Sequence, residues 1–125
     1  MKKVVTIFGA LLIVSFTSFC YGQNLPLIDT ADNSFGLWMS RDDNTPLIFG
    51  FESPDTKSQK VICFSSSTPD VEGNPHQCKL GAYYETNDLN IEYVGMEGNF
   101  VKLIFKTEGS TDVIFYMEKK NVTIQ

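Results

Sequence analysis

Beyond residue 34, apolar and polar side chains alternate with a period of two along most of the chain. In one run Leu47, Phe49 and Phe51 share a face, and in another Val101 and Leu103 do. A period of two is typical of a β-strand with one buried face and one wet face. We therefore predict eight short strands, at residues 35–41, 46–52, 60–66, 77–85, 89–94, 100–106, 112–118 and 122–124.

Clusters of Asp, Asn, Gly, Ser and Pro separate these strands at roughly 9–12-residue intervals, a spacing typical of a sandwich or barrel. No stretch of 10–15 residues carries a helical apolar stripe, which disfavours a parallel βαβ architecture. Short connections favour pairing between neighbours in sequence. The pattern predicts an all-β fold, an antiparallel up-and-down meander that forms a small barrel, with a β-sandwich as the alternative.

The N-terminus has the composition of a secretory signal peptide. Lys2 and Lys3 are followed by an apolar run over residues 4–19, and Cys20 and Gly22 are small residues at the positions that a signal peptidase reads. We predict cleavage after Gly22 and export to the periplasm or medium. The run is shorter than the ~20 residues of a membrane span. A lipoprotein anchored through Cys20 is the less favoured alternative, because the preceding residue is the bulky Phe19.

This prediction divides the chain into a signal peptide (1–22), a lead-in segment (23–33) and a single β domain (34–125). Loss of Lys2 and Lys3 leaves 8 basic residues against 15 acidic ones, a net charge of −7. An acidic chain is poorly suited to nucleic acid, whose phosphates require a basic surface. We expect no nucleic-acid partner and no membrane span after cleavage.

Two cysteines remain in the mature chain, Cys63 and Cys78. Two cysteines in an exported protein are usually joined in a disulfide. They lie at similar distances from the middle of the 67–75 loop, so a hairpin centred there would place them opposite each other. The sequence predicts one disulfide between them, with two free buried thiols as the alternative.

The only tryptophan lies in the motif Gly36-Leu37-Trp38. This motif, together with about eight meander strands, resembles the opening of the lipocalin-like (calycin) barrels. The resemblance implies a barrel closed by Trp38 at one end and open at the other to a small apolar ligand. Inward-facing aromatic residues would line such a pocket or simply fill the core, and the candidates are Trp38, Phe49, Phe51, Tyr84, Tyr93, Phe105 and Phe115.

Catalytic and metal-binding patterns are weak. His76 is the only histidine, and the nearby Asp70 and Glu72 are on the same loop. The serines at 65–67 lack a Gly-x-Ser-x-Gly elbow. Asp42-Asp43-Asn44 has oxygen ligands for calcium but not the spacing of a dedicated loop, so a turn is predicted. We expect no catalytic residues, no metal site and no cofactor.

The sequence therefore favours an exported, non-catalytic binding protein. Its partner would be a small apolar ligand inside the barrel, or an extracytoplasmic protein or glycan bound by surface loops. An inhibitor or immunity-type protein that uses the 67–75 loop is the alternative, and an enzyme based on His76 is the least favoured class.

Overall fold

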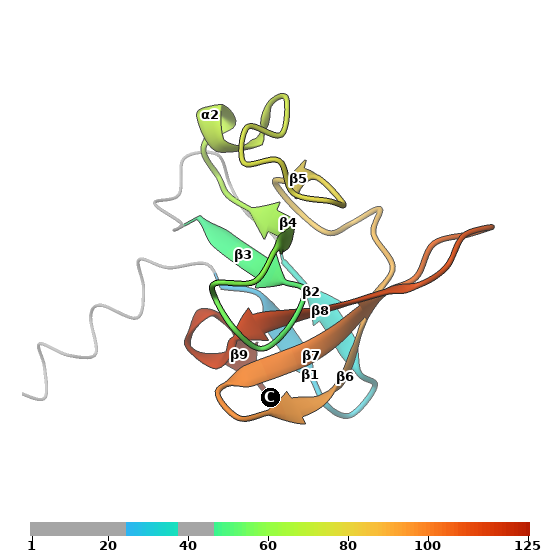
Figure 1. Ribbon diagram of the computed structural model, residues 1–125. Helices are drawn as coiled ribbons and strands as arrows, with labels where there is room; N and C mark the ends of the chain where they lie inside the picture. Colours follow the sequence, from blue (N-terminus) through green and yellow to red (C-terminus); the bar gives the residue numbers. More distant parts are fainter. Residues whose placement is uncertain (1–24, 38–46) are drawn as a thin grey trace, which may run out of the picture.

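The computed structural model describes residues 25–37 and 47–125 (Figure 1). Nearly all of its regular structure is β. The strands are β1 (Leu27–Asp29), β2 (Ser34–Gly36), β3 (Ile48–Phe51), β4 (Lys60–Phe64), β5 (Ala82–Tyr83), β6 (Ile91–Glu97), β7 (Phe100–Phe105), β8 (Val113–Glu118) and β9 (Thr123–Ile124). Two short helices accompany them, α2 (Thr68–Val71) and the 3₁₀ turn η2 (Lys119–Asn121). The predicted all-β class is confirmed.

All nine strands belong to one sheet, in the order β5-β4-β3-β8-β7-β6-β2-β1-β9. The pairs are antiparallel except at the two ends, where β4–β5 and β1–β9 run parallel. The two terminal strands do not pair with each other, so the sheet is open and the predicted closed barrel is wrong. The meander is also incomplete, because β3 pairs with β8 and β2 with β6 across long stretches of sequence.

Most strands lie where the alternation places them, with two main differences. Residues 23–33, predicted as a lead-in segment, contribute β1, which pairs with β2 and β9. The predicted strand at 77–85 is reduced to the two residues of β5. Of the predicted first strand, the structure describes only the part up to Leu37, and the rest lies outside the described residues.

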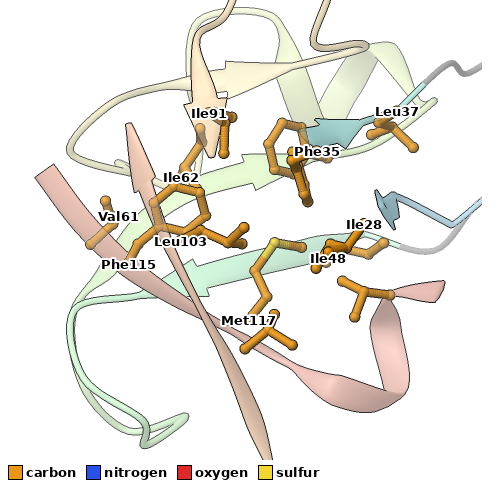
Figure 2. Close-up of a cluster of buried hydrophobic side chains, with 13 residues drawn as sticks. Ile28, Phe35, Leu37, Ile48, Val61, Ile62, Ile91, Leu103, Phe115 and Met117 are labelled. Atoms are coloured by element: carbon orange, nitrogen blue, oxygen red, sulfur yellow. The ribbon is translucent and has the colours of Figure 1, made fainter. Parts of the chain in front are cut away.

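The core lies on the inner face of the sheet, where side chains from most of the strands converge (Figure 2). Leu103, Phe115 and Met117 from β7 and β8 are fully buried, as their alternation predicts. The complete cluster contains Ile28, Phe35, Leu37, Ile48, Val61, Ile62, Phe64, Ile91, Val101, Leu103, Phe115, Met117 and Val122. This interior is packed with side chains.

The predicted orientation of the β3 side chains is wrong. Ile48 and Gly50 pair with Phe64 and Ile62 of β4 on the inner face, and Phe49 pairs with Cys63 on the outer face. A Cβ atom at Gly50 would lie 2.5 Å from Cδ2 of Phe115. Only glycine, which has no Cβ atom, leaves room for the Phe115 ring at this position. The Phe115 ring fills the inner side of β3, and the aromatic residues of β3 lie away from the core centre.

Candidate functional site

The segment between β4 and β5, residues 65–81, is a crossover connection; we call it the crossover loop. It runs over the outer face of the sheet so that β5 lies parallel to β4, as a parallel pair requires. The Cys63 amide donates to the Gly81 carbonyl over 3.2 Å, and the Ser65 amide donates to the Tyr83 carbonyl over 3.2 Å. The hairpin predicted for this region is therefore wrong. In Figure 1 the loop and α2 stand together at the top of the view.

A hydrogen-bond network fixes the first half of the crossover loop. The buried Ser65 hydroxyl donates to Oδ2 of Asp70 over 2.8 Å and accepts from the Ser67 amide over 3.0 Å. Nε2 of His76 lies 3.5 Å from Oδ1 of the same Asp70 carboxylate. The His76 ring also meets the Phe49 ring edge-on, with centroids 5.3 Å apart. These contacts tie the loop to the outer face of β3.

The arrangement of Ser65, Asp70 and His76 does not fit a serine nucleophile that is activated by a histidine base. The carboxylate lies between the serine and the histidine, whereas an activated serine requires the histidine beside its hydroxyl. The Ser65 side chain is also buried. The arrangement fits a clamp that holds the loop.

Removing the central carboxylate should loosen this clamp. We expect Asp70→Ala to lower the free energy of unfolding by about 1–2 kcal/mol, because the buried Ser65 hydroxyl loses its acceptor. Asp70→Asn retains an acceptor oxygen and should cost clearly less. Urea denaturation of the two variants checks this prediction, and equal losses would contradict it.

The predicted Cys63–Cys78 disulfide is not formed, and both residues are free, buried thiols. Cys63 is on the outer face of β4, and the crossover loop places Cys78 against it, where a hydrogen bond links the two thiols. Burial raises the pKa of Cys63 to about 12, and the neighbouring Cys78 adds to the rise. Burial also raises the pKa of Cys78, although the Cys63 hydrogen bond and Lys60 oppose it.

These thiols should make the reduced protein sensitive to alkali. Folding raises the pKa of the Cys63 thiol above its ordinary value of 9.0. The resulting stabilisation is fully present below pH 9 and is lost as the pH rises toward 12. We expect the free energy of unfolding to fall by about 2 kcal/mol by about pH 11. Denaturation at a series of pH values in the presence of reductant measures this loss. Cys63→Ala is the control, and its free energy of unfolding should fall less steeply with pH. A flat profile would contradict free thiols.

A cleft of about 540 Å³ opens between the end of α2 and the segment that leaves β5. It is lined by Val71, Glu72, Gly73, Ala82, Tyr83, Tyr84, Glu85, Asp88 and Leu89. The Tyr84 hydroxyl bridges its walls, 3.1 Å from Oγ1 of Thr68 and 3.4 Å from Oε2 of Glu72. Burial raises the pKa of Tyr83, whose ring packs against Phe64 of the core.

Three carboxylates surround this cleft, from Glu72, Glu85 and Asp88. The ion pairs within residues 25–37 and 47–125 are His76–Asp70, Lys106–Glu92 and Lys120–Glu118, so none of the three cleft acids is paired with a cation there. With the apolar side chains of Val71, Ala82 and Leu89, they form an amphipathic, anionic site. Such a site is suited to an organic cation.

The predicted aromatic pocket is not assembled. Phe115 is buried in the core, and Tyr93 and Phe105 pack against it. Phe49 and Phe51 contact each other, with ring centroids 6.2 Å apart, and Nζ of Lys60 lies 4.9 Å above the Phe49 ring.

Of the predicted aromatic residues that the structure describes, Tyr84 alone lines the cleft. Trp38, which carries the lipocalin-like resemblance, lies outside the described residues, as do the predicted signal peptide and the Asp42-Asp43-Asn44 turn.

Sequence reasoning missed the acidic residues of the cleft. Glu72 precedes Gly73 on the crossover loop, whereas Glu85 and Asp88 flank the turn after β5. The only sequence signal was the excess of acids, because the parallel β4–β5 pairing that brings these segments together is not visible in the local pattern.

Two smaller hollows also occur on the described surface. One, of about 400 Å³, is lined by Leu25, Leu27, Ser34, Gly36, Leu37, Thr86 and Asn87. The other, of about 410 Å³, is lined by Asn99, Glu118, Lys119 and Lys120. Neither combines tyrosines with several carboxylates that lack an ion-pair partner in the described residues, as the α2–β5 cleft does.

In the part of the chain that the structure describes, no three His, Cys, Asp or Glu side chains gather as a metal site would require. No helix in that part has the length and apolar character needed to cross a bilayer. No protein-family model matches the chain, and neither a curated protein nor a solved structure is significantly similar to it.

Proposed function

We propose that this chain is an exported, non-catalytic binding protein and that its binding surface is the α2–β5 cleft. The observation that carries the proposal is the set of carboxylates from Glu72, Glu85 and Asp88 around an apolar floor, without a basic partner in the described residues. The preferred ligand is a cationic side chain of an extracytoplasmic protein. Lysine and arginine offer both an apolar stem and a charged end to such a site.

The core argues for a surface site over an internal one. Leu103, Phe115 and Met117 are fully buried where a barrel-type ligand would lie, and the sheet is open. An apolar ligand would have to displace these side chains. A protein partner that docks on the loops needs no such rearrangement.

The alternative function, that of an inhibitor or immunity-type protein, would use the same surface. The crossover loop is held by the Ser65–Asp70–His76 clamp, and the Asn74 side chain bonds both the amide and the carbonyl of Cys78, at 3.0 and 2.9 Å. A loop fixed before binding loses little entropy on docking. This preorganisation favours a loop that presents a wall of the cleft to a partner.

The test is calorimetric titration with acetyl-lysine-methylamide and with a short lysine peptide. We expect Glu72→Gln/Glu85→Gln to weaken binding by about tenfold, equivalent to about 1.4 kcal/mol. The matched control is Glu97→Gln/Glu108→Gln, which removes the same charge from exposed residues that do not line the cleft. Equal effects of the two double variants would mean that only overall charge matters, and the proposal would fail.

A further inference from the structure

The outer edge of β5 forms part of the cleft. Among residues 25–37 and 47–125, β5 is the last strand at its end of the sheet and pairs with β4 alone. The bonds toward β4 are made by the carbonyls of Tyr83 and of Gly81, the residue before β5. The Gly81 carbonyl accepts from the amide of Cys63 in β4, and the Tyr83 carbonyl accepts from the amide of Ser65, the residue after β4. Because backbone groups of successive strand residues point to opposite sides, the amide and carbonyl of Ala82 point away from β4. The edge of β5 thus offers one donor and one acceptor to a further strand.

The position of Ala82 ties this edge to the anionic cleft. Ala82 pairs with Cys63, whose side chain is on the outer face that the crossover loop covers. Ala82 and Glu72 both line the cleft, so its α2 wall rises from this same face. A residue that pairs with Ala82 on a new strand would direct its side chain to this face, because directly paired residues share a face.

We propose that the partner docks by strand addition: an extended segment pairs with the β5 edge and places a lysine or arginine opposite Ala82. This inference rests on the proposed function and specifies that an extended segment of the partner carries the cationic side chain. The main-chain bonds supply affinity, and the pocket for the paired side chain supplies specificity. The charge of the cleft selects a basic residue at that position, because its carboxylates lack a basic partner in the described residues.

The opposite end of the sheet does not offer the same combination. β9 is also a terminal strand, but neither Thr123 nor Ile124 lines any of the three hollows described above. Lys119 and Lys120, in the turn before it, would repel a basic segment. The β5 edge is therefore the docking edge that suits a cationic strand.

The test uses the peptide acetyl-Thr-Val-Lys-Val-Thr-amide in three forms. One is unmodified, one is N-methylated at the lysine, and one is N-methylated at the following valine. In an added strand that runs antiparallel to β5, the lysine amide bonds the Ala82 carbonyl, whereas the amide of the following valine points away from the sheet. We expect methylation at lysine to weaken binding by about tenfold or more, since it removes a main-chain bond and adds bulk at the edge. Methylation at valine should change affinity by less than about twofold.

Hydrogen exchange gives an independent readout. The Ala82 amide should exchange quickly in the free protein and slowly in the peptide complex. Equal affinities of the three peptides, with Glu72→Gln/Glu85→Gln still weakening all of them, would overturn strand addition and leave the cationic site standing. No binding of the peptide or of acetyl-lysine-methylamide would overturn both. An Ala82 amide already protected in the concentrated protein alone, with a dimer in sedimentation, would mean that a second copy occupies the edge and would overturn the proposed partner.

Discussion

Phe115→Ala should lower the free energy of unfolding by about 3–5 kcal/mol, the usual cost of deleting a fully buried aromatic side chain. Phe115 has no exposed surface and belongs to β8, which lies between β3 and β7 in the sheet. Its ring lies against the backbone of Gly50, so the vacated space is bordered by main chain that cannot easily collapse into it. Because a small domain has about 5–15 kcal/mol of stability in total, this loss is large.

Ile114→Ala is the matched control. Ile114 precedes Phe115 on the same strand but points to the opposite face, where its side chain is 42% exposed. We expect that change to cost less than about 1 kcal/mol. Urea denaturation of both variants gives the comparison. Losses of similar size would mean that the inner face of the sheet is not the core.

Gly50→Ala should destabilise the protein by about 3 kcal/mol, near the upper end of the range for overpacking. The new methyl group would lie 2.5 Å from Cδ2 of Phe115 and 2.8 Å from Cγ2 of Ile62. Both neighbours are fully buried. The change therefore forces a shift of β3 against β8 or β4.

Gly95→Ala is the control for the loss of glycine itself. Gly95 is in β6, and a methyl group there would meet nothing within 4 Å. Replacing glycine at an open strand position should be neutral or stabilising by about 0.5–1 kcal/mol, because the unfolded chain loses freedom. If the two glycine variants had the same stability, the close packing of β3 on Phe115 would be wrong. Thermal and urea unfolding both provide this measurement.

The strands that the sequence predicts best are those whose signals are local. β6, β7 and β8 each alternate with a period of two, and β6 and β7 are joined by a tight turn in which Gly98 has a positive φ of 59°. Such signals lie within a few residues of each other. They need no knowledge of the remaining chain, so β7 and β8 are predicted close to their observed bounds and with the correct buried face. β6 is predicted as a strand at 89–94, but it continues to Glu97.

β3 shows why a correct strand can have the wrong face. The alternation of Phe49 and Phe51 with Ile48 and Gly50 allows either set to be buried. The outcome depends on Phe115, more than sixty positions later, whose ring fills the space where a side chain at residue 50 would lie. The outer face is then covered by the crossover loop, which buries apolar residues there as well.

The candidate site depends on pairing that local patterns do not encode. Gly81, with φ at 105°, helps the chain turn back before β5, so β5 runs parallel to β4. The expected hairpin would have placed Cys63 and Cys78 on paired strands and left no crossover loop above the sheet. The acids of the cleft come together only through this parallel pairing. Their excess was visible in the sequence, but their grouping was not.

The most direct test of the proposed site is an amide-resolved NMR titration with acetyl-lysine-methylamide. The carboxylates of Glu72, Glu85 and Asp88 predict that the shifts centre on the residues lining the α2–β5 cleft, at 71–73, 82–85 and 88–89. Added salt should reduce the affinity, because the site is open to solvent screening. Shifts spread evenly over the acidic surface, or confined to the inner face around Leu103 and Phe115, would contradict a cationic-ligand site in this cleft.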